Sequence, residues 1–214
     1  LLARVADGAL RSIGLSLAVT LAALVVGVLM GLIPRASRGL VEVTNAAPPV
    51  VTGILIAAIW GPSAGGAAVA VLIVTWAPLA AHTAALVEET RARPYISILP
   101  TLGAGNARIL FGSVVPSVVP AVLRHAMIRL PGVALALAAL GFLGLGPQPP
   151  TADWGLILSD GVAAVERAPW VTAAPLASLI ALAVLAVSLA GATSGRVRKT
   201  GSVIEKVDAG GRST

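Results

Sequence analysis

The sequence predicts an all-α integral membrane protein, a polytopic bundle with five visible transmembrane helices. Hydrophobic residues make up 57% of the 214-residue chain and charged residues only 11%, whereas a soluble domain carries about a quarter charged residues. Several apolar runs are close to twenty residues long, the length that a helix needs to cross a bilayer. They lack the period-two alternation of membrane strands, so helices are the expected spanning elements.

The predicted spans belong to one membrane domain, residues 1–192, which a basic and flexible tail, residues 193–214, is expected to follow. The spans cover residues 13–34, 45–61, 66–87, 113–143 and 170–192. In the first span, Gly27 and Gly31 are predicted to let a neighbouring helix approach closely. The chain begins without a signal-peptide pattern, and we expect it to be an interior piece of a longer protein that lacks its first span.

Prolines mark the second and fourth spans. The second span is the shortest, and Pro48 and Pro49 shape its start. The fourth has 31 residues, about 46 Å of helix, which exceeds the roughly 30 Å of a bilayer core. Pro116 and Pro120 therefore predict a separate or bent segment where this span begins.

Lysine and arginine counts predict the orientation. The connections 35–41 and 88–112 and the tail hold ten of these residues, whereas residues 1–12, 62–65 and 144–169 hold three. The positive-inside rule places the first group in the cytoplasm. The C-terminus is then cytoplasmic, the N-terminus lies outside, and 144–169 is an extracytoplasmic loop. Trp60, Trp154 and Trp170 fall at the predicted outer boundaries, as an interfacial belt would require.

The longest cytoplasmic connection, residues 88–112, is too polar to cross the membrane but contains apolar side chains. Pro100 and the Gly103–Gly105 turn break it into short segments, which we expect to be helices with one apolar face. Two interpretations stay open for this loop. It is either an interfacial loop helix or a docking element for a soluble partner.

Three polar residues interrupt the fourth span: Arg124, His125 and Arg129. If the span begins near residue 126, both arginines reach the cytoplasmic surface by snorkelling. If Arg129 instead lies near mid-depth, it must face a wet pathway, because a lipid-facing charge is costly there. In that case Arg129 would meet a carboxylate of a transported peptide or metal chelate.

Motifs for enzymatic or metal chemistry are weak. Residues 61–65, Gly-Pro-Ser-Ala-Gly, fit the Gly-x-Ser-x-Gly pattern of serine hydrolases, which needs a strand–turn–helix context that is not expected here. An intramembrane serine protease using Ser63 with His82 or His125 is therefore kept only as an alternative. The chain has no cysteine and two histidines, and no metal site is predicted. It also lacks a Gly-x-x-x-x-Gly-Lys-Ser/Thr phosphate loop, so no bound cofactor is expected.

The loop 88–112 resembles the cytoplasmic loop of importer permeases of ATP-binding-cassette transporters. That family shows Glu-Ala-Ala, three residues, Gly, nine residues and Ile-x-Leu-Pro. With its Gly on Gly103, the final Pro falls on Pro116, while Ser97 stands where the family has Glu. The resemblance implies that this loop docks on an ATPase, and the residues it points to are Tyr95, Ser97, Ile98, Leu99, Leu102, Gly103 and Ala104.

The stretch after the fourth span resembles one class of these permeases more closely. Phe-Leu-Gly-Leu-Gly at 142–146, Pro-Pro at 149–150, Trp-Gly at 154–155 and Ala-Pro-Trp at 168–170 match the dipeptide, oligopeptide and nickel class, as its second-permease, C-type subunit. The matching loop residues are Phe142, Gly144, Gly146, Pro149, Pro150, Trp154 and Gly155. The class normally has six spans, and the usual Gly-Asp-Gly-Leu-Arg-Asp after the last span is replaced by "GATSGRVRKT".

The resemblance implies a multi-pass permease subunit of the cytoplasmic (inner) membrane. It would form half of the translocation pathway for small peptides, nickel or a metal-chelate complex. Its partners would be a second homologous permease, two ATP-binding subunits or a fused pair, an extracytoplasmic substrate-binding protein and membrane lipid, with no nucleic acid. ATP would be hydrolysed by the partner subunits and not by this chain. A membrane scaffold subunit without transport activity is the remaining alternative.

Overall fold

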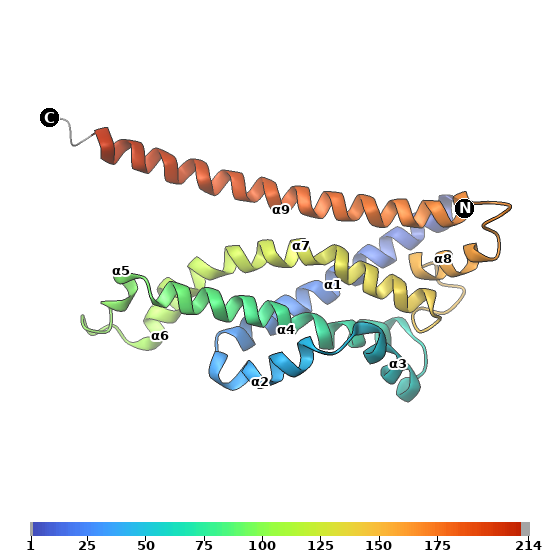
Figure 1. Ribbon diagram of the computed structural model, residues 1–214, viewed down its shortest axis with the longest axis horizontal. Coiled ribbons are helices and arrows are strands. Elements are labelled where there is room, and N and C mark those ends of the chain that lie inside the picture. The colour runs from blue at the N-terminus through green and yellow to red at the C-terminus, as the bar shows by residue number, and fades with distance from the viewer. Residues whose placement is uncertain (1, 211–214) are drawn as a thin grey trace.

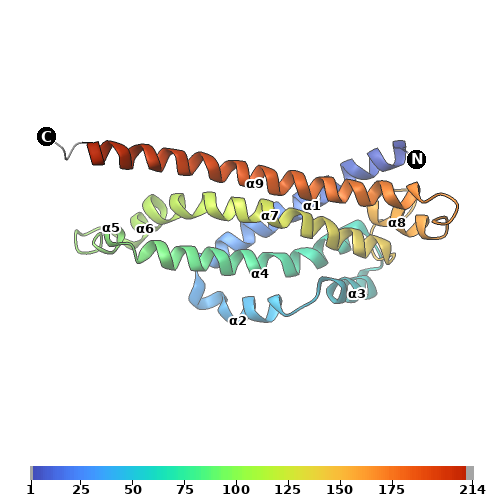
Figure 2. The same cartoon turned by 45° about the horizontal axis from the view of Figure 1, so that its top comes forward.

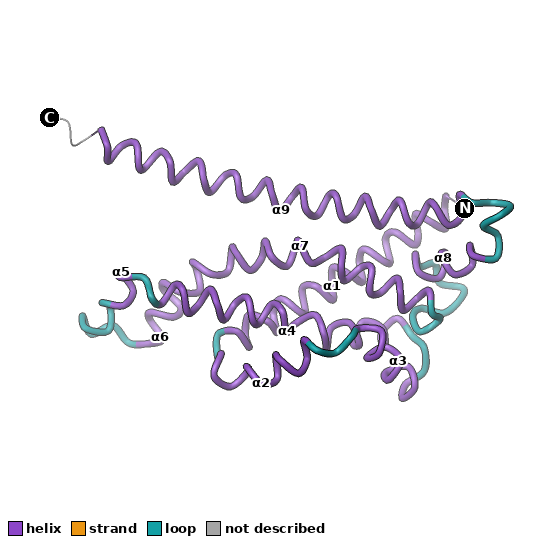
Figure 3. The backbone as a smooth tube through the Cα atoms, viewed as in Figure 1, coloured by secondary structure: helices purple, strands orange, loops and turns teal. Residues whose placement is uncertain are grey.

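The computed structural model describes residues 2–210, and within that range the side chains other than those of 2–3, 34–37 and 193–210. Every regular element in this range is a helix (Figures 1 and 3), which confirms the predicted fold class. The elements are α1 (Leu2–Gly31), α2 (Pro34–Asn45), α3 (Pro49–Trp60), α4 (Ala64–Arg91), α5 (Pro94–Ser97), α6 (Asn106–Ile109), the π-helix η1 (Leu110–Val114), α7 (Val115–Phe142), α8 (Trp154–Val162) and α9 (Trp170–Gly210).

Four stretches of helix are long and apolar enough to cross a membrane. They are Arg4–Gly31, Ala64–Arg91, Asn106–Phe142 and Trp170–Ala192. A fifth candidate is the pair Arg38–Asn45 and Pro49–Trp60, which are bent by 91° at a short break. The described residues therefore provide four spanning helices, or five if this bent pair counts as one span.

The predicted second span, residues 45–61, is not one straight helix. Only α3 lies within it, and its 12 residues are about 18 Å long, too short to cross a 30 Å core. The break has a local cause, because Pro48 has an extended backbone with ψ of 135° and Pro49 occupies the first turn of α3. Neither proline has an N–H to continue a helix from α2.

The fourth span also differs from its predicted bounds. Helix continues from Asn106 to Phe142 and passes through both Pro116 and Pro120. Pro116 is tolerated because it lies in the first turn of α7. The prolines predict an irregularity here, and the structure shows it as the π-helix η1, which ends at Val114, two residues before Pro116, and not as a separate segment.

Helices α1, α4 and α7 pack against one another at the centre of the bundle. Figures 1 and 2 both show α9 on one side of the α4–α7 pair and α2 and α3 on the other. Contact between α1 and α4 is close because of the predicted glycine pair. A Cβ atom on Gly27 would lie 2.6 Å from Cβ of Leu79, and one on Gly31 would lie 2.7 Å from the carbonyl oxygen of Ala80. The packing role predicted for these glycines is confirmed.

The bundle has two distinct ends. The N-terminal part of α1 lies at one end with α8, whereas α5 and α6 lie at the other end, towards which α9 runs (Figure 1). This arrangement agrees with a predicted orientation in which the two termini face opposite sides. Which end is cytoplasmic remains a prediction from the charge count. Helix α9 extends through the predicted tail as far as Gly210, and residues 211–214 lie outside the described part.

Candidate functional site: a helical tip and a central cavity

The predicted docking loop is a compact cap at the end of α4. Helix α5 begins at Pro94, and its Ile96 is buried (2% exposed) within the core cluster that joins α4 to α7. Leu99 and Ala104 pack partly against the same cluster. Gly103 turns the chain with a φ of +83°, a value that glycine adopts without strain. The buried side of the loop is therefore anchored to the bundle.

Three apolar side chains of this loop point away from the core. Tyr95, Ile98 and Leu102 are 56%, 53% and 74% exposed, and we call these three residues the apolar tip. Ser97 is exposed too, but its hydroxyl donates to the carbonyl oxygen of Pro94 at 3.0 Å and so serves the loop itself. Phe111, which the loop prediction did not include among the docking residues, is 65% exposed.

Charged side chains at the base of the tip are paired within the chain. Arg93 binds Glu89 at 3.2 Å, and Arg38 of α2 binds Glu88 at 2.8 Å. A hydrogen bond to the side chain of Tyr95, followed by the one to Glu89, raises the pKa of Arg93 above its ordinary value. Arg93 thus stays protonated, and its hydrogen bonds connect Tyr95 of the apolar tip to Glu89 at the end of α4.

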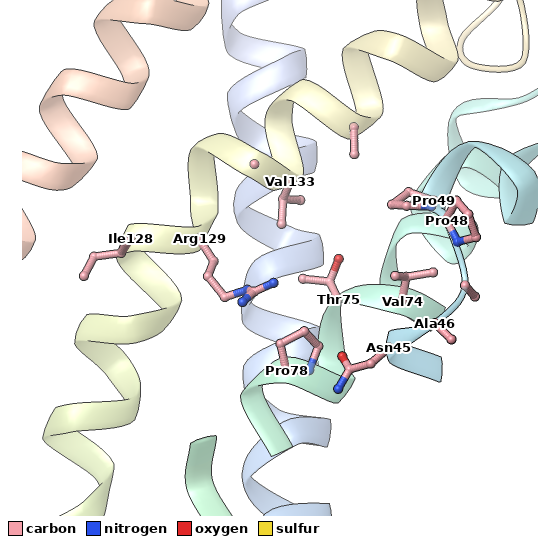
Figure 4. Close-up of a pocket in the computed structure, with 13 residues that line it drawn as sticks. Asn45, Ala46, Pro48, Pro49, Val74, Thr75, Pro78, Ile128, Arg129 and Val133 are labelled. Atoms are coloured by element: carbon pink, nitrogen blue, oxygen red, sulfur yellow. The ribbon is translucent and has the colours of Figure 1, made fainter. Parts of the chain in front are cut away.

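The second candidate site is a cavity of about 660 Å³, which we call the central cavity. It is bounded by α7 around Arg129, by α4 around Thr75 and Pro78, and by the α2–α3 break from Asn45 to Pro49. In Figure 4 the guanidinium of Arg129 points across the cavity towards Thr75 and Pro78. The residues that it faces lie in the middle of α4, with eleven residues of that helix before Thr75 and thirteen after Pro78.

Backbone features add polarity to the wall of this cavity. Pro78 has no N–H, so the carbonyl oxygen of Val74 loses its usual partner in α4. The hydroxyl of Thr75 donates to the carbonyl oxygen of Val71 at 2.7 Å, which leaves its oxygen free to accept a further hydrogen bond. Asn45 ends α2 and brings a side-chain amide to the same cavity. A cation, an amide and free acceptors therefore share one space.

The structure separates the three polar residues predicted in the fourth span. Arg129 lines the central cavity, whereas Arg124 and His125 are not among its lining residues. His125 stacks on His82 of α4, with ring centroids 4.2 Å apart and an interplanar angle of 22°. This histidine pair fills the space between α4 and α7 one helical turn from Arg129. All three predicted residues are half-buried.

The loop after α7 is a docked structural element with a buried polar connection to α1. The carboxylate of Asp153 accepts a hydrogen bond from the Ser12 hydroxyl at 2.7 Å and one from the Gly155 N–H at 2.9 Å, and Asp153 is only 5% exposed. The backbone N–H of Trp154 donates to the Ser12 oxygen at 3.1 Å. Sequence reasoning missed this pair, although an Asp directly before Trp-Gly is a recognisable helix N-cap.

The prediction that Trp154 belongs to an interfacial belt is wrong. Trp154 is 1% exposed, and its indole N–H donates to the carbonyl oxygen of Val5 at 3.4 Å. Its position in the first turn of α8 carries it between α1 and α7, because the Asp153 cap fixes the direction in which the helix begins. Trp60 and Trp170, by contrast, are 66% and 60% exposed.

The other residues of this loop divide between close packing and exposure. Gly155 lies so close to α7 that a Cβ atom would overlap the carbonyl oxygen of Ala138, and one on Gly146 would lie 2.9 Å from Cα of Gly141. Gly144 turns the chain with a φ of +74°. Phe142, Pro149 and Pro150 are exposed. The glycines of the motif thus permit the folding of the loop onto the bundle.

Comparison with known proteins identifies the family. A family model described as a binding-protein-dependent transport system inner membrane component matches residues 12–199. The chain belongs to this family. Like other members, it is a membrane transport component, which agrees with the resemblance seen in the sequence.

The relatives of this chain include peptide transport proteins. The di/tripeptide transport system permease protein DppC of Pseudomonas aeruginosa is 33% identical over 199 residues, which is 89% of this chain and 65% of that protein. The dipeptide transport system permease protein DppC of Escherichia coli K12 is 35% identical over 151 residues, 71% of this chain and 50% of its own length. The peptide transport system permease protein SapC of Escherichia coli is 30% identical over 198 residues, 89% of this chain and 67% of its own length. The chain thus spans only half to two-thirds of these relatives.

A solved structure shows the same fold. The MetNI methionine ABC transporter, in an inward-facing conformation, contains a chain that superposes with a TM-score of 0.73. The match covers 90% of this protein and 95% of that chain at 16% identity.

The geometry gives no support to the hydrolase alternative. Ser63 is the N-cap of α4, and its side chain accepts a hydrogen bond from the Gly66 N–H at 3.0 Å. His82 is 19 residues further along the same helix, about 28 Å away, and His125 stacks on His82. Ser63 therefore has neither histidine as a base.

Proposed function

We propose that this chain forms half of the translocation pathway of an ATP-driven importer for short peptides, with the ATPase as a separate subunit. Membership of the transport family supports the class of protein, and the peptide permeases among its relatives support the class of substrate. Nickel or a metal chelate is the alternative cargo that the sequence resemblance brought in. Among the described residues, no group of three or more His, Cys, Asp or Glu side chains could hold a metal ion.

The apolar tip is the observation that carries the proposal. Tyr95, Ile98 and Leu102 are exposed at one end of the bundle, while Ile96 in the same loop is buried and fixes the loop to α4 and α7. An exposed apolar cluster on a rigid base is suited to fit a groove on a soluble partner. Ser97, Leu99, Gly103 and Ala104 contribute to this docking surface by shaping the loop. The surface lies at the end of the bundle that the charge count places in the cytoplasm.

The central cavity supplies the pathway in this proposal. Arg129 lines it, and His125 and Arg124 lie on the turns of α7 between the cavity and the tip end. A second permease would complete the pathway, because one bundle with an open cavity cannot enclose a solute. The extracytoplasmic loop around Phe142 and Pro149 faces the side from which a substrate-binding protein would deliver the peptide.

The test uses the complete transporter. The full-length permease is co-expressed with its second permease, ATPase subunits and binding protein, and the complex is reconstituted in proteoliposomes. We expect peptide-loaded binding protein to stimulate ATP hydrolysis and peptide uptake. Leu102→Asp should abolish co-purification of the ATPase, because a charge would replace the most exposed side chain of the apolar tip.

Val165→Asp is the matched control, since Val165 is also an exposed apolar residue (46%) but lies in the loop at the opposite end. If the wild-type complex forms but takes up no peptide, the chain would be a scaffold subunit and not part of a transport pathway. Normal ATPase binding by the Leu102 variant would reject the apolar tip as the docking surface. Uptake of nickel salts or nickel chelates in place of peptides would reassign the cargo.

A further inference from the structure

We propose that Arg129 forms a carboxylate-binding site in the central cavity, which receives the C-terminal carboxylate of the peptide during its passage. The inference rests on the proposed function, because it requires that the cavity lie on the transport pathway. It names the chemical group of the cargo that the permease itself recognises.

The first argument is the depth of Arg129. Its guanidinium faces Thr75 and Pro78, and the stretches of α4 on either side of them are about 16 Å and 20 Å long. Half of a bilayer core is about 15 Å. A cation in the middle of a spanning bundle is retained only when it faces a partner or a wet cavity. Arg129 faces a cavity.

The second argument is the missing counter-charge. The ion pairs of the described part of the chain occupy Arg4, Arg38 and Arg93, and no carboxylate of that part lies within ion-pair distance of Arg129. Arg129 is half-buried all the same. A partly desolvated guanidinium without an acidic partner is costly, so a ligand that supplies the carboxylate would gain a strong, charge-assisted pair.

The third argument is the room beside the guanidinium. Gly132, one turn further along α7, also lines the cavity, and a Cβ atom added to it would meet no atom within 4 Å. The cavity volume of about 660 Å³ falls within the roughly 300–1,000 Å³ of small-molecule sites. An extended tripeptide is about 10 Å long, so a short peptide is of a suitable size.

The fourth argument is the chemistry of the surrounding groups. The planar guanidinium offers paired N–H donors that match the two oxygens of a carboxylate. The side-chain amide of Asn45 adds a further donor, while the free oxygens at Thr75 and Val74 suit the N–H groups of a peptide backbone. The stacked rings of His82 and His125 fill the space between α4 and α7 on one side of Arg129. The guanidinium is therefore directed into the cavity.

The experiment compares uptake by wild-type and variant transporters in proteoliposomes that contain the full complex. Each complex is given one tripeptide with a free C-terminus and the same tripeptide as its C-terminal amide. The ratio of variant to wild-type uptake is taken for each peptide, so that any preference of the binding protein cancels. Arg129→Gln should lower uptake of the free acid about 10- to 100-fold, as expected for the loss of a hydrogen-bonded charge. Uptake of the amide should be unchanged relative to wild type.

Two further variants sharpen the test. Gly132→Leu fills the open space and should lower uptake of both peptides while leaving the complex intact. Arg167→Gln removes an exposed arginine from the loop at the opposite end and is the control that should change neither ratio. Uptake of nickel–citrate is measured in the same way, to distinguish a peptide carboxylate from a chelate carboxylate. Only the class of solute that the transporter carries should show a lower uptake in Arg129→Gln.

The outcomes separate this inference from the proposed function. An equal loss of free acid and amide in Arg129→Gln, or no loss of either, overturns the carboxylate site. In both cases ATPase stimulation by loaded binding protein still reports a working importer. If the wild-type complex itself shows no stimulation and no uptake, the proposed function fails instead.

Discussion

At the scale of single residues, the least predictable feature is the buried connection between Ser12 and Asp153. An aspartate near a membrane boundary looks like a solvated loop residue in the sequence, because nothing local indicates that α1 will supply a hydroxyl to it. The glycines and prolines of the same motif predict a turn, and Gly144 turns the chain there with a φ of +74°, but these residues do not predict the burial of the loop. The prediction for Trp154 fails for this reason, because its burial depends on a contact between Ser12 and Asp153, which lie 141 residues apart in the sequence.

Removal of the buried carboxylate should destabilise the protein. Asp153→Ala leaves the Ser12 hydroxyl and the Gly155 N–H without their acceptor, which costs about 1–3 kcal/mol for a buried group. The measurement is the thermal unfolding midpoint of the purified chain in detergent. Asp160→Ala is the matched control, because Asp160 forms only an exposed ion pair with Arg4 and such pairs contribute little. Equal shifts in the two variants would contradict the prediction.

At the scale of helices, the sequence predicted which segments are apolar better than it predicted their ends. Helix α1 begins well before residue 13, because Arg4 and Arg11 remain compatible with a helix that extends beyond the membrane core. The second span was the largest difference. A hydropathy pattern does not report that Pro48 and Pro49 separate α3 from α2 at an angle of 91°, since the direction of a break depends on the packing of α2 against α4.

The contact between α1 and α4 can be tested with glycine substitutions. Gly31→Ala should destabilise the bundle by about 1–3 kcal/mol, because its methyl group would press on the backbone of α4 at Ala80. Gly14→Ala in the same helix meets no atom within 4 Å and should be neutral or slightly stabilising. The measurement compares the thermal unfolding midpoints of the two variants in detergent. A neutral Gly31→Ala would show that the helices separate more readily than the structure indicates.

At the scale of the whole molecule, the arrangement of the two ends follows from charge and span counting alone. The separation of α8 from α5 and α6 agrees with that count, because each span reverses the direction of the chain. The central cavity could not be predicted in the same way. It requires the break between α2 and α3, the proline in α4 and the glycine in α7 to face one another, and their alignment is a property of the packed bundle.

The orientation is open to direct measurement because the chain contains no cysteine. Single cysteines at Leu102 and Val165 would mark the two ends. In intact spheroplasts, a membrane-impermeant maleimide should label Val165→Cys and leave Leu102→Cys unlabelled, and permeabilisation should expose both. The reverse pattern would invert the topology and remove the apolar tip from the side on which ATP is available.

The close contact between α1 and α4 has a mechanical consequence. Helix α4 is continuous from Ala64 to Arg91, about 42 Å, and α5 follows it after a two-residue turn. Because Gly27 and Gly31 bring the backbone of α1 against it, we expect the two helices to move together as one rigid unit. A force applied to the apolar tip by a bound partner would then reach the wall of the central cavity at Pro78 through these two helices. A residue that belongs to neither the tip nor the cavity, such as Gly31, would thereby influence how far the cavity moves for a given displacement of the tip.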